Sequence, residues 1–154
     1  MTTNCGVEYL SLDDVLALHD FIMERTDEPS APLRLPDLLQ SAMARAQQAA
    51  YYEDADLIRQ ACLLMVGIAQ AQAFLSGNKR TAMLTALAFL DRNGAIFIGE
   101  RELLGVLLEE CPDIQPQERA ISSIEAWVRR RCLALEDDEA DLRKVSAGED
   151  DDPW

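Results

Sequence analysis

Apolar residues recur at intervals of three or four positions along most of the chain, a spacing that predicts α-helices. The first such segment covers residues 12–25, and Ser11 and Asp14 form a capping-box-like pair at its start. The stretch "TDEPSAP" then predicts a loop. Pro36 fits the first turn of a second helix, "PDLLQSAMARAQQ". Each segment carries one apolar stripe, so both helices are expected to pack on a core.

The middle of the chain predicts two central helices joined by a short loop. A helix that starts at Asp54 or Asp56 and runs to about Phe74 is apolar on almost every side, as a buried helix is. Gly77 interrupts this helix, and another runs over about residues 78–92. An Asn-Gly pair then supplies a left-handed C-terminal stop.

The remaining segments predict shorter elements. "AIFI" reads as a short strand or an extended segment, and helices are expected over residues 100–110 and 117–133. The tail is expected to continue as helix to about Lys144 and then to fray. Together the elements predict an all-α bundle in one domain.

Composition and charge narrow the function classes. Hydrophobic residues make up 49% of the chain and aromatic residues only 6%, which favours helices over sheets. The formal net charge is −14, and a protein this acidic repels nucleic-acid backbones. Nine acidic and two basic residues lie in residues 136–154, so half of the net charge belongs to the tail. The "NKR" of the body is therefore a local positive spot.

No segment predicts export or membrane insertion. The N-terminus lacks a basic region followed by an apolar run. The uncharged stretch from Gln60 to Asn78 has the length of a bilayer span, but it contains polar side chains and its apolar residues stop at Leu75, which favours a buried helix. The four cysteines lack metal-ligand spacing and are expected to be reduced thiols of a cytoplasmic protein.

The stretch "GNKRT" is the best candidate for binding an anion. A helix N-terminus has unpaired N–H groups and partial positive charge, so phosphates bind there. Gly77 allows close backbone approach, and Asn78 can cap the helix or bind a phosphate oxygen. Lys79 and Arg80 add charge, and Thr81 adds a hydroxyl. The alternative is ordinary turn chemistry beside a solvated basic face, since the second glycine and the Lys-Thr order of a P-loop are absent.

The stretch "AQAFLSGNKRTAMLTALAFLDRNG" resembles the signature of the Fic/Doc (Fido) family, in its Doc-like branch, where the motif runs H-x-F-x-[D/N/E]-[G/A]-N-K-R. "YLSLDDVLALHDFIMER" and "PLRLPDLLQSAMARAQ" also resemble Doc-like segments in order and spacing. The resemblance implies a Fido helical bundle over residues 8–134, followed by an acidic tail at 135–154. In that fold a central helix–loop–helix carries the phosphate-binding loop.

The resemblance also implies an activity and partners. Fic relatives transfer a nucleoside monophosphate, whereas Doc toxins transfer the γ-phosphate of ATP to a protein hydroxyl of the translation machinery. In both, the motif histidine takes a proton, the acidic residue holds Mg²⁺ and the Gly-Asn-Lys-Arg loop holds phosphates. Met83 in place of a second arginine favours phosphate transfer over AMP transfer. The self-inhibitory Glu-Gly or Glu-Asn motif is absent, which implies restraint by a Phd-like antitoxin.

Two departures from the motif weaken the expected chemistry. Gln72 occupies the position of the histidine, and an amide is no general base near neutral pH. Ser76 replaces the acidic metal ligand and is a weak Mg²⁺ ligand. Loss of a base costs about 10²–10⁴-fold in rate. Arg80 remains as a candidate catalytic and phosphate-binding arginine. His19 lies among apolar positions of the first helix, so it is expected to pack in the core.

Several alternatives stay open on the sequence. Gln72 is either an engineered replacement or a natural loss that leaves a binding protein, or catalysis proceeds through another carboxylate, such as Asp54 or Asp56. Arg45 matches an arginine of the family's second segment and either faces the cleft or lies on the surface, and Arg34 is expected on the surface. The acidic tail is either a solvated end or a cover for the "NKR" loop.

Overall fold

The computed structural model describes residues 6–26 and 33–134. Within these ranges the chain forms six α-helices, one 3-10 helix and a two-stranded sheet, which confirms the predicted all-α class. The elements are α1 (Leu12–Arg25), α2 (Pro36–Glu53), α3 (Leu57–Ala71), α4 (Asn78–Arg92), β1 (Ala95–Phe97), α5 (Arg101–Glu110), η1 (Cys111–Asp113), α6 (Gln117–Arg129) and β2 (Cys132–Ala134).

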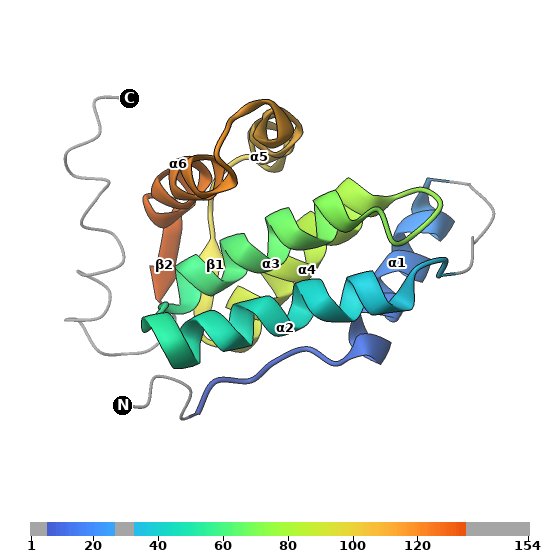
Figure 1. Cartoon of the computed structure of the whole chain (residues 1–154), viewed down its shortest axis with the longest axis horizontal. Coiled ribbons are helices and arrows are strands. Elements are labelled where there is room, and N and C mark those ends of the chain that lie inside the picture. The colour runs from blue at the N-terminus through green and yellow to red at the C-terminus, as the bar shows by residue number, and fades with distance from the viewer. Residues whose placement is uncertain (1–5, 27–32, 135–154) are drawn as a thin grey trace.

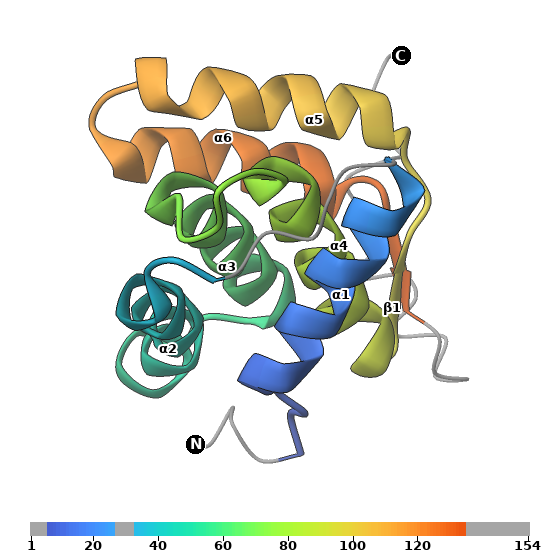
Figure 2. The same ribbon diagram turned by 90° about the vertical axis from the view of Figure 1, so that its right-hand side faces the viewer.

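Helix α3 is the centre of the fold. It packs between α2 and α4, and α1 covers α4 (Figure 1). Helices α5 and α6 form a separate layer against the other helices (Figure 2). Ten of the fifteen residues of α3 are buried, as its all-round apolar sequence predicts.

Small residues set the distance between α2 and α3. The face of α2 that meets α3 carries buried alanines, among them Ala42 and Ala46. A Cβ built on Gly67 of α3 would lie 3.2 Å from the Cβ of Ala42. The two backbones therefore approach closely at this point.

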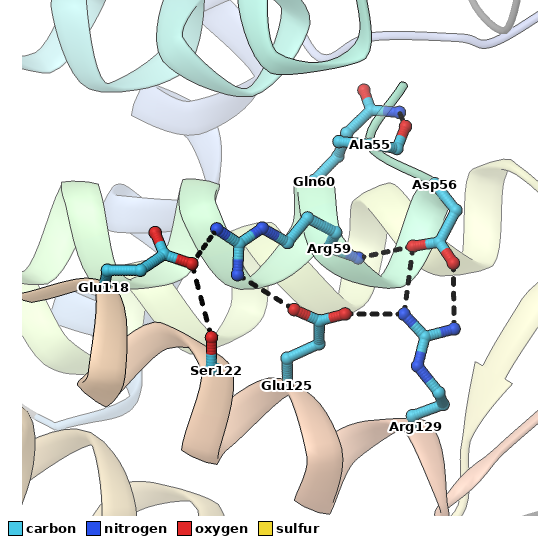
Figure 3. A network of polar contacts seen from close by, with 8 residues as sticks. All are labelled: Ala55, Asp56, Arg59, Gln60, Glu118, Ser122, Glu125 and Arg129. Carbon is cyan, nitrogen blue, oxygen red and sulfur yellow. Dashed lines mark hydrogen bonds and ion pairs between the residues drawn. The ribbon is translucent and has the colours of Figure 1, made fainter. Parts of the chain in front are cut away.

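A charged network joins the N-terminal half of α3 to α6 (Figure 3). Asp56 caps α3 by accepting the N–H of Arg59 at 2.9 Å, and it also binds Arg129 at 2.8 Å. The Glu125 carboxylate accepts hydrogen bonds from Arg59 at 3.0 Å and from Arg129 at 2.7 Å, and Glu118 forms an ion pair with Arg59 at 2.5 Å. Burial raises the pKa of Asp56, but the hydrogen bonds from Arg129 and from the Arg59 N–H lower this pKa further, to below its ordinary value.

The structure corrects three predicted helix ends. Helix α2 continues to Glu53, beyond the predicted stretch "PDLLQSAMARAQQ". Helix α3 ends at Ala71, before Phe74, because the chain turns at the loop described below. The helix predicted over residues 117–133 ends at Arg129, because the chain beyond it pairs as β2 with β1, antiparallel, placing Leu133 opposite Ile96. The strand in "AIFI" is confirmed over residues 95–97.

Two other predictions concern the tail and the possibility of a membrane span. The predictions for the tail, its helix and its cover over the loop, fall on residues 135–154 and lie outside them. Among the described residues, no helix has both the length and the apolar character needed to cross a membrane.

Candidate functional site

The candidate site is the loop between α3 and α4. Two left-handed residues shape it: Gln72, with φ 53° and ψ 41°, ends α3, and Gly77, with φ 80° and ψ 14°, begins α4. The first hydrogen bond of α4 runs from the Thr81 N–H to the Gly77 carbonyl at 2.9 Å. The N–H groups of residues 78–80 therefore have no acceptor inside the helix and are the donors available to an anion.

Asn78 holds the loop from within. Its side chain is buried, its Oδ1 accepts the Phe74 N–H at 3.0 Å, and its Nδ2 donates to the Phe74 carbonyl at 2.8 Å. The prediction that Asn78 caps α4 is wrong, because Gly77 is the cap residue and the amide of Asn78 is engaged by Phe74. The N–H groups of residues 78–80 and the side chains of Lys79 and Arg80 are called the cradle below. Asn78 offers only its backbone N–H to the cradle, and its side chain holds the loop's shape.

Helix α1 contacts the loop through His19. His19 is 1% exposed, its Nε2 donates to the Ser76 carbonyl at 3.0 Å, and its ring stacks on Phe74 with centroids 3.8 Å apart. Because a carbonyl only accepts, Nε2 must carry a proton. The prediction of a core histidine is confirmed. Its contact with the loop gives no signal in the sequence, because His19 lies 57 residues before Ser76.

The same helix packs closely against Gly77 of the loop. A Cβ built on Gly77 would lie only 2.5 Å from the terminal methyl of Met23. The positive φ of Gly77 also disfavours any residue with a side chain. Glycine therefore allows both the turn and the close packing of the loop on α1.

The chain before α2 covers the other side of the loop. The N–H groups of Arg34 and Leu35 both donate to the Ala73 carbonyl, at 2.9 and 3.1 Å, and Leu33 forms a β-bridge with Phe74. The predicted surface position of Arg34 is confirmed, because the residue is exposed. No sequence pattern indicates that the Arg34 backbone lies beside the motif loop.

The positive side chains of the loop face solvent on the first turn of α4. Lys79 and Arg80 are both exposed, and Lys79 pairs with Glu109 of α5 at 2.5 Å. An ion pair between two exposed side chains contributes about 0–1 kcal/mol, so a polyanion can compete for Lys79. Thr81, in contrast, is fully buried. The prediction that its hydroxyl contributes to the exposed cradle is therefore wrong.

The positions of the base and the metal ligand hold groups unsuited to those roles. Gln72 is exposed and its Nε2 donates to the Ala69 carbonyl at 2.9 Å. The Ser76 hydroxyl lies 3.7 Å from the Met23 sulfur. Mg²⁺ prefers carboxylate oxygens, and no group of three or more His, Cys, Asp or Glu side chains suited to a metal occurs among residues 6–26 and 33–134. The side chain at the metal position is therefore a hydroxyl in place of a carboxylate.

Two other predicted participants lie away from the loop, and a third, Arg45, is engaged elsewhere. Asp54 and Asp56 precede the first residue of α3, whereas Gln72 follows its last. A helix of 15 residues is about 22 Å long, so the alternative of catalysis through either aspartate is wrong. Arg45 donates to Gln117 at 3.2 Å, and Gln117 in turn binds Gln70 of α3. Arg45 thus joins α2 to α6.

Comparisons with known proteins agree with this architecture. A model described as "Fic/DOC family" matches residues 9–90, which include α1, α2, α3 and most of α4. "Protein kinase doc" of Escherichia phage P1 is 30% identical to this chain over 127 residues, covering 80% of this chain and 95% of that protein. Both matches include the loop held by His19 and Asn78, and the chain belongs to the Fic/DOC family.

Proposed function

We propose that this protein is a Doc-like member of a type II toxin–antitoxin module that binds ATP at the Gly77–Arg80 loop and is impaired as a phosphotransferase. The observation that carries the proposal is the combination at the loop. The start of α4 offers the N–H groups of residues 78–80, which have no acceptor inside the helix, and two exposed cations, while the side chain at the base position is the amide of Gln72.

The phosphate-binding half of the proposal rests on the start of α4. The N–H groups of residues 78–80 and the partial positive charge of the helix N-terminus favour a phosphate. Lys79 and Arg80 add two cations on the same exposed turn. The buried contacts of Asn78 and His19 keep the loop in this shape, so little ordering is needed on binding.

The catalytic half is where the chain departs from its family. Transfer of the γ-phosphate needs a group that accepts the proton of the attacking hydroxyl, and Gln72 cannot accept it. The lost base alone lowers the rate by about 10²–10⁴-fold. Activity as an intact Doc-like enzyme would be directed at a protein hydroxyl of the translation machinery, in the cytoplasm, under the control of a Phd-like antitoxin.

A second function is favoured by the same residues. With an amide at the base position and no carboxylate at the metal position, the protein acts as a binding module that holds a nucleotide or a partner without chemistry. AMP transfer is less supported, because Met83 is a partly buried residue near Gly105 of α5 and supplies no second cation at the loop.

Calorimetric titration with ATP, with and without Mg²⁺, tests the cradle. We expect saturable binding that is lost when Lys79→Ala and Arg80→Ala are combined. The matched control combines Arg101→Ala and Arg119→Ala, which also removes two exposed positive charges but leaves the loop intact. Equal affinity of the two double variants would show that ATP does not use this loop.

Restoring the motif tests the catalytic half. Gln72→His, alone and with Ser76→Asp, is expected to raise ATP-dependent phosphorylation of protein in a cell extract by about 10²-fold or more. Growth arrest on expression would provide a second readout. If ATP binds but neither variant transfers phosphate, the binding-module function is the correct one.

A further inference from the structure

A carboxylate from outside the motif lies at the cradle. Glu109, in the last turn of α5, pairs with Lys79 on the first turn of α4, with 2.5 Å between Oε2 and Nζ. The two residues are 30 positions apart in the sequence, and α5 packs on α4. The Lys79 side chain is 50% exposed and the Glu109 side chain 57%, so a ligand that enters the cradle from solvent meets both charges.

The two cations of the cradle are therefore not equivalent. Arg80 is exposed and has no ion pair within the part of the chain that the structure describes. A phosphate can bind Arg80 and the N–H groups of residues 78–80 without displacing a charged group, but at Lys79 it lies beside the Glu109 carboxylate. Ser76 supplies no carboxylate at the loop, whereas Glu109 brings one to it from α5.

A carboxylate beside a phosphate site discriminates between two forms of a nucleotide. Like charges a few ångströms apart repel, and the repulsion grows with the charge of the ligand. Free ATP carries more negative charge than its Mg²⁺ complex, because the bound ion cancels part of the charge of the phosphates. Mg²⁺ is also commonly held by one or two carboxylates together with substrate phosphates. Both effects disfavour free ATP more than the complex.

We propose that Glu109 makes the cradle selective for a nucleotide complexed with Mg²⁺ over the free nucleotide. The inference rests on the proposed binding of ATP at the cradle and adds the form in which ATP binds. Glu109 acts through its charge, as a specificity-determining residue outside the motif. Its contact with Lys79 keeps the carboxylate at the first turn of α4 before the ligand arrives.

Calorimetric titration of the full chain with ATP, in excess Mg²⁺ and in EDTA at matched low ionic strength, tests the inference. The measured quantity is the ratio of the Kd for free ATP to the Kd for the Mg²⁺ complex. Release of Lys79 in Glu109→Gln raises the affinity for both forms, so only the ratio isolates the effect of the carboxylate. We expect this ratio to fall by about three- to tenfold in Glu109→Gln, chiefly because free ATP binds more tightly.

Glu102→Gln is the matched control. Glu102 is exposed on the same helix, seven residues before Glu109. It lies on nearly the same face of α5, about 10 Å away along the axis. The change removes an equal charge and should leave the ratio unaltered. Glu109→Asp keeps a carboxylate at the cradle and should retain most of the selectivity.

The outcomes distinguish this inference from the proposed function. If the unaltered chain binds neither form of ATP, the proposed cradle is wrong and this inference with it. If ATP binding requires Lys79 and Arg80 but Glu109→Gln leaves the ratio unchanged, the cradle stands and Glu109 forms only an ordinary surface ion pair. An equal fall of the ratio in Glu102→Gln would assign the selectivity to the overall charge of α5 and overturn the role of Glu109.

Discussion

The side-chain amide of Asn78 is one of the groups that hold the motif loop in its conformation. Asn78 brackets the N–H and the carbonyl of Phe74, and both groups are buried. The chain contains a second bracket of the same kind, in which Asn93 accepts the Glu8 N–H at 2.7 Å and donates to the Glu8 carbonyl at 2.8 Å. The second bracket is exposed to solvent on the Glu8 side. A comparison of Asn78 with Asn93 therefore separates the contribution of the amide hydrogen bonds from the effect of burial.

We predict that Asn78→Asp lowers the free energy of unfolding by at least about 2 kcal/mol. The change removes the donor to the Phe74 carbonyl and faces that carbonyl with a buried carboxylate. Asn93→Asp makes the same exchange where water can solvate the charge, and should cost about 1 kcal/mol or less. Urea unfolding at pH 7 measures both. Equal losses would show that burial at Asn78 does not matter.

Residue chemistry in the motif was readable from the sequence, but side-chain direction was not. Gly77, Lys79 and Arg80 have the conformation or exposure that an anion site needs. Asn78 and Thr81 turn inward instead. A helix places neighbouring residues on different faces, and which face is buried depends on the elements that pack against it. The motif string alone does not contain that information.

At the scale of helices, contact distance decides what a glycine does. Gly67 of α3 and Gly105 of α5 both lie inside helices, where alanine is the better helix former. A Cβ on Gly105 would meet only the sulfur of Met83, at an ordinary 3.6 Å. At Gly67 it would meet Ala42 at 3.2 Å, with the Ala42 backbone directly behind.

We predict opposite outcomes for the two substitutions. Gly105→Ala should stabilise the protein by about 0.5–1 kcal/mol through helix propensity. Gly67→Ala should give no gain, or a loss of about 1–2 kcal/mol, because α2 must move away from α3. Thermal and urea unfolding of both variants checks this. A gain at Gly67 equal to that at Gly105 would mean that α2 adjusts without cost.

The helices were more predictable than the segments between them. The bounds of α1 follow from its capping box and apolar stripe, and residues 78–92 were located correctly. The errors fall at residues 49–53, 72–74 and 130–134, and at the last two, contacts with distant parts of the chain override the local pattern. The loop that follows Gln72 is held by His19 of α1 and by Arg34 and Leu35 before α2, and β2 forms by pairing with β1.

For the whole molecule, the charged network of Figure 3 attaches the α5–α6 layer to the core. Asp56 is its acidic member with a lowered pKa. A carboxyl whose pKa is lower in the folded state stabilises the fold above its unfolded pKa, and this contribution disappears as the pH falls through the folded pKa. The network should therefore weaken below about pH 4, the range in which aspartate protonates.

We predict that Asp56→Asn destabilises the protein by about 0.5–1 kcal/mol at pH 7, through loss of the ion pair with Arg129. Asparagine still caps the helix, so the cap is retained. The difference from the unaltered chain should shrink as the pH falls below about 4. Urea unfolding across pH 3–7 measures it. The control Asp37→Asn removes an exposed charge from the first turn of α2, where no ion pair is found in the described residues.

An equal pH dependence in the two variants would assign the effect to the helix dipole. A smaller loss of unfolding free energy in Asp37→Asn than in Asp56→Asn would assign the effect to the ion pair between Asp56 and Arg129.

The contacts that shape the motif loop have a consequence for protein engineering. Its shape is set by His19 and Met23, more than fifty residues upstream of Ser76, and by the strand-like segment before α2. A graft of "QAFLSGNKRTA" onto another helical hairpin would transfer the charged residues but not the side chains of α1 and the segment before α2 that hold the loop in shape. To transfer a working cradle, the recipient protein must also receive α1, as a second segment inserted before the hairpin.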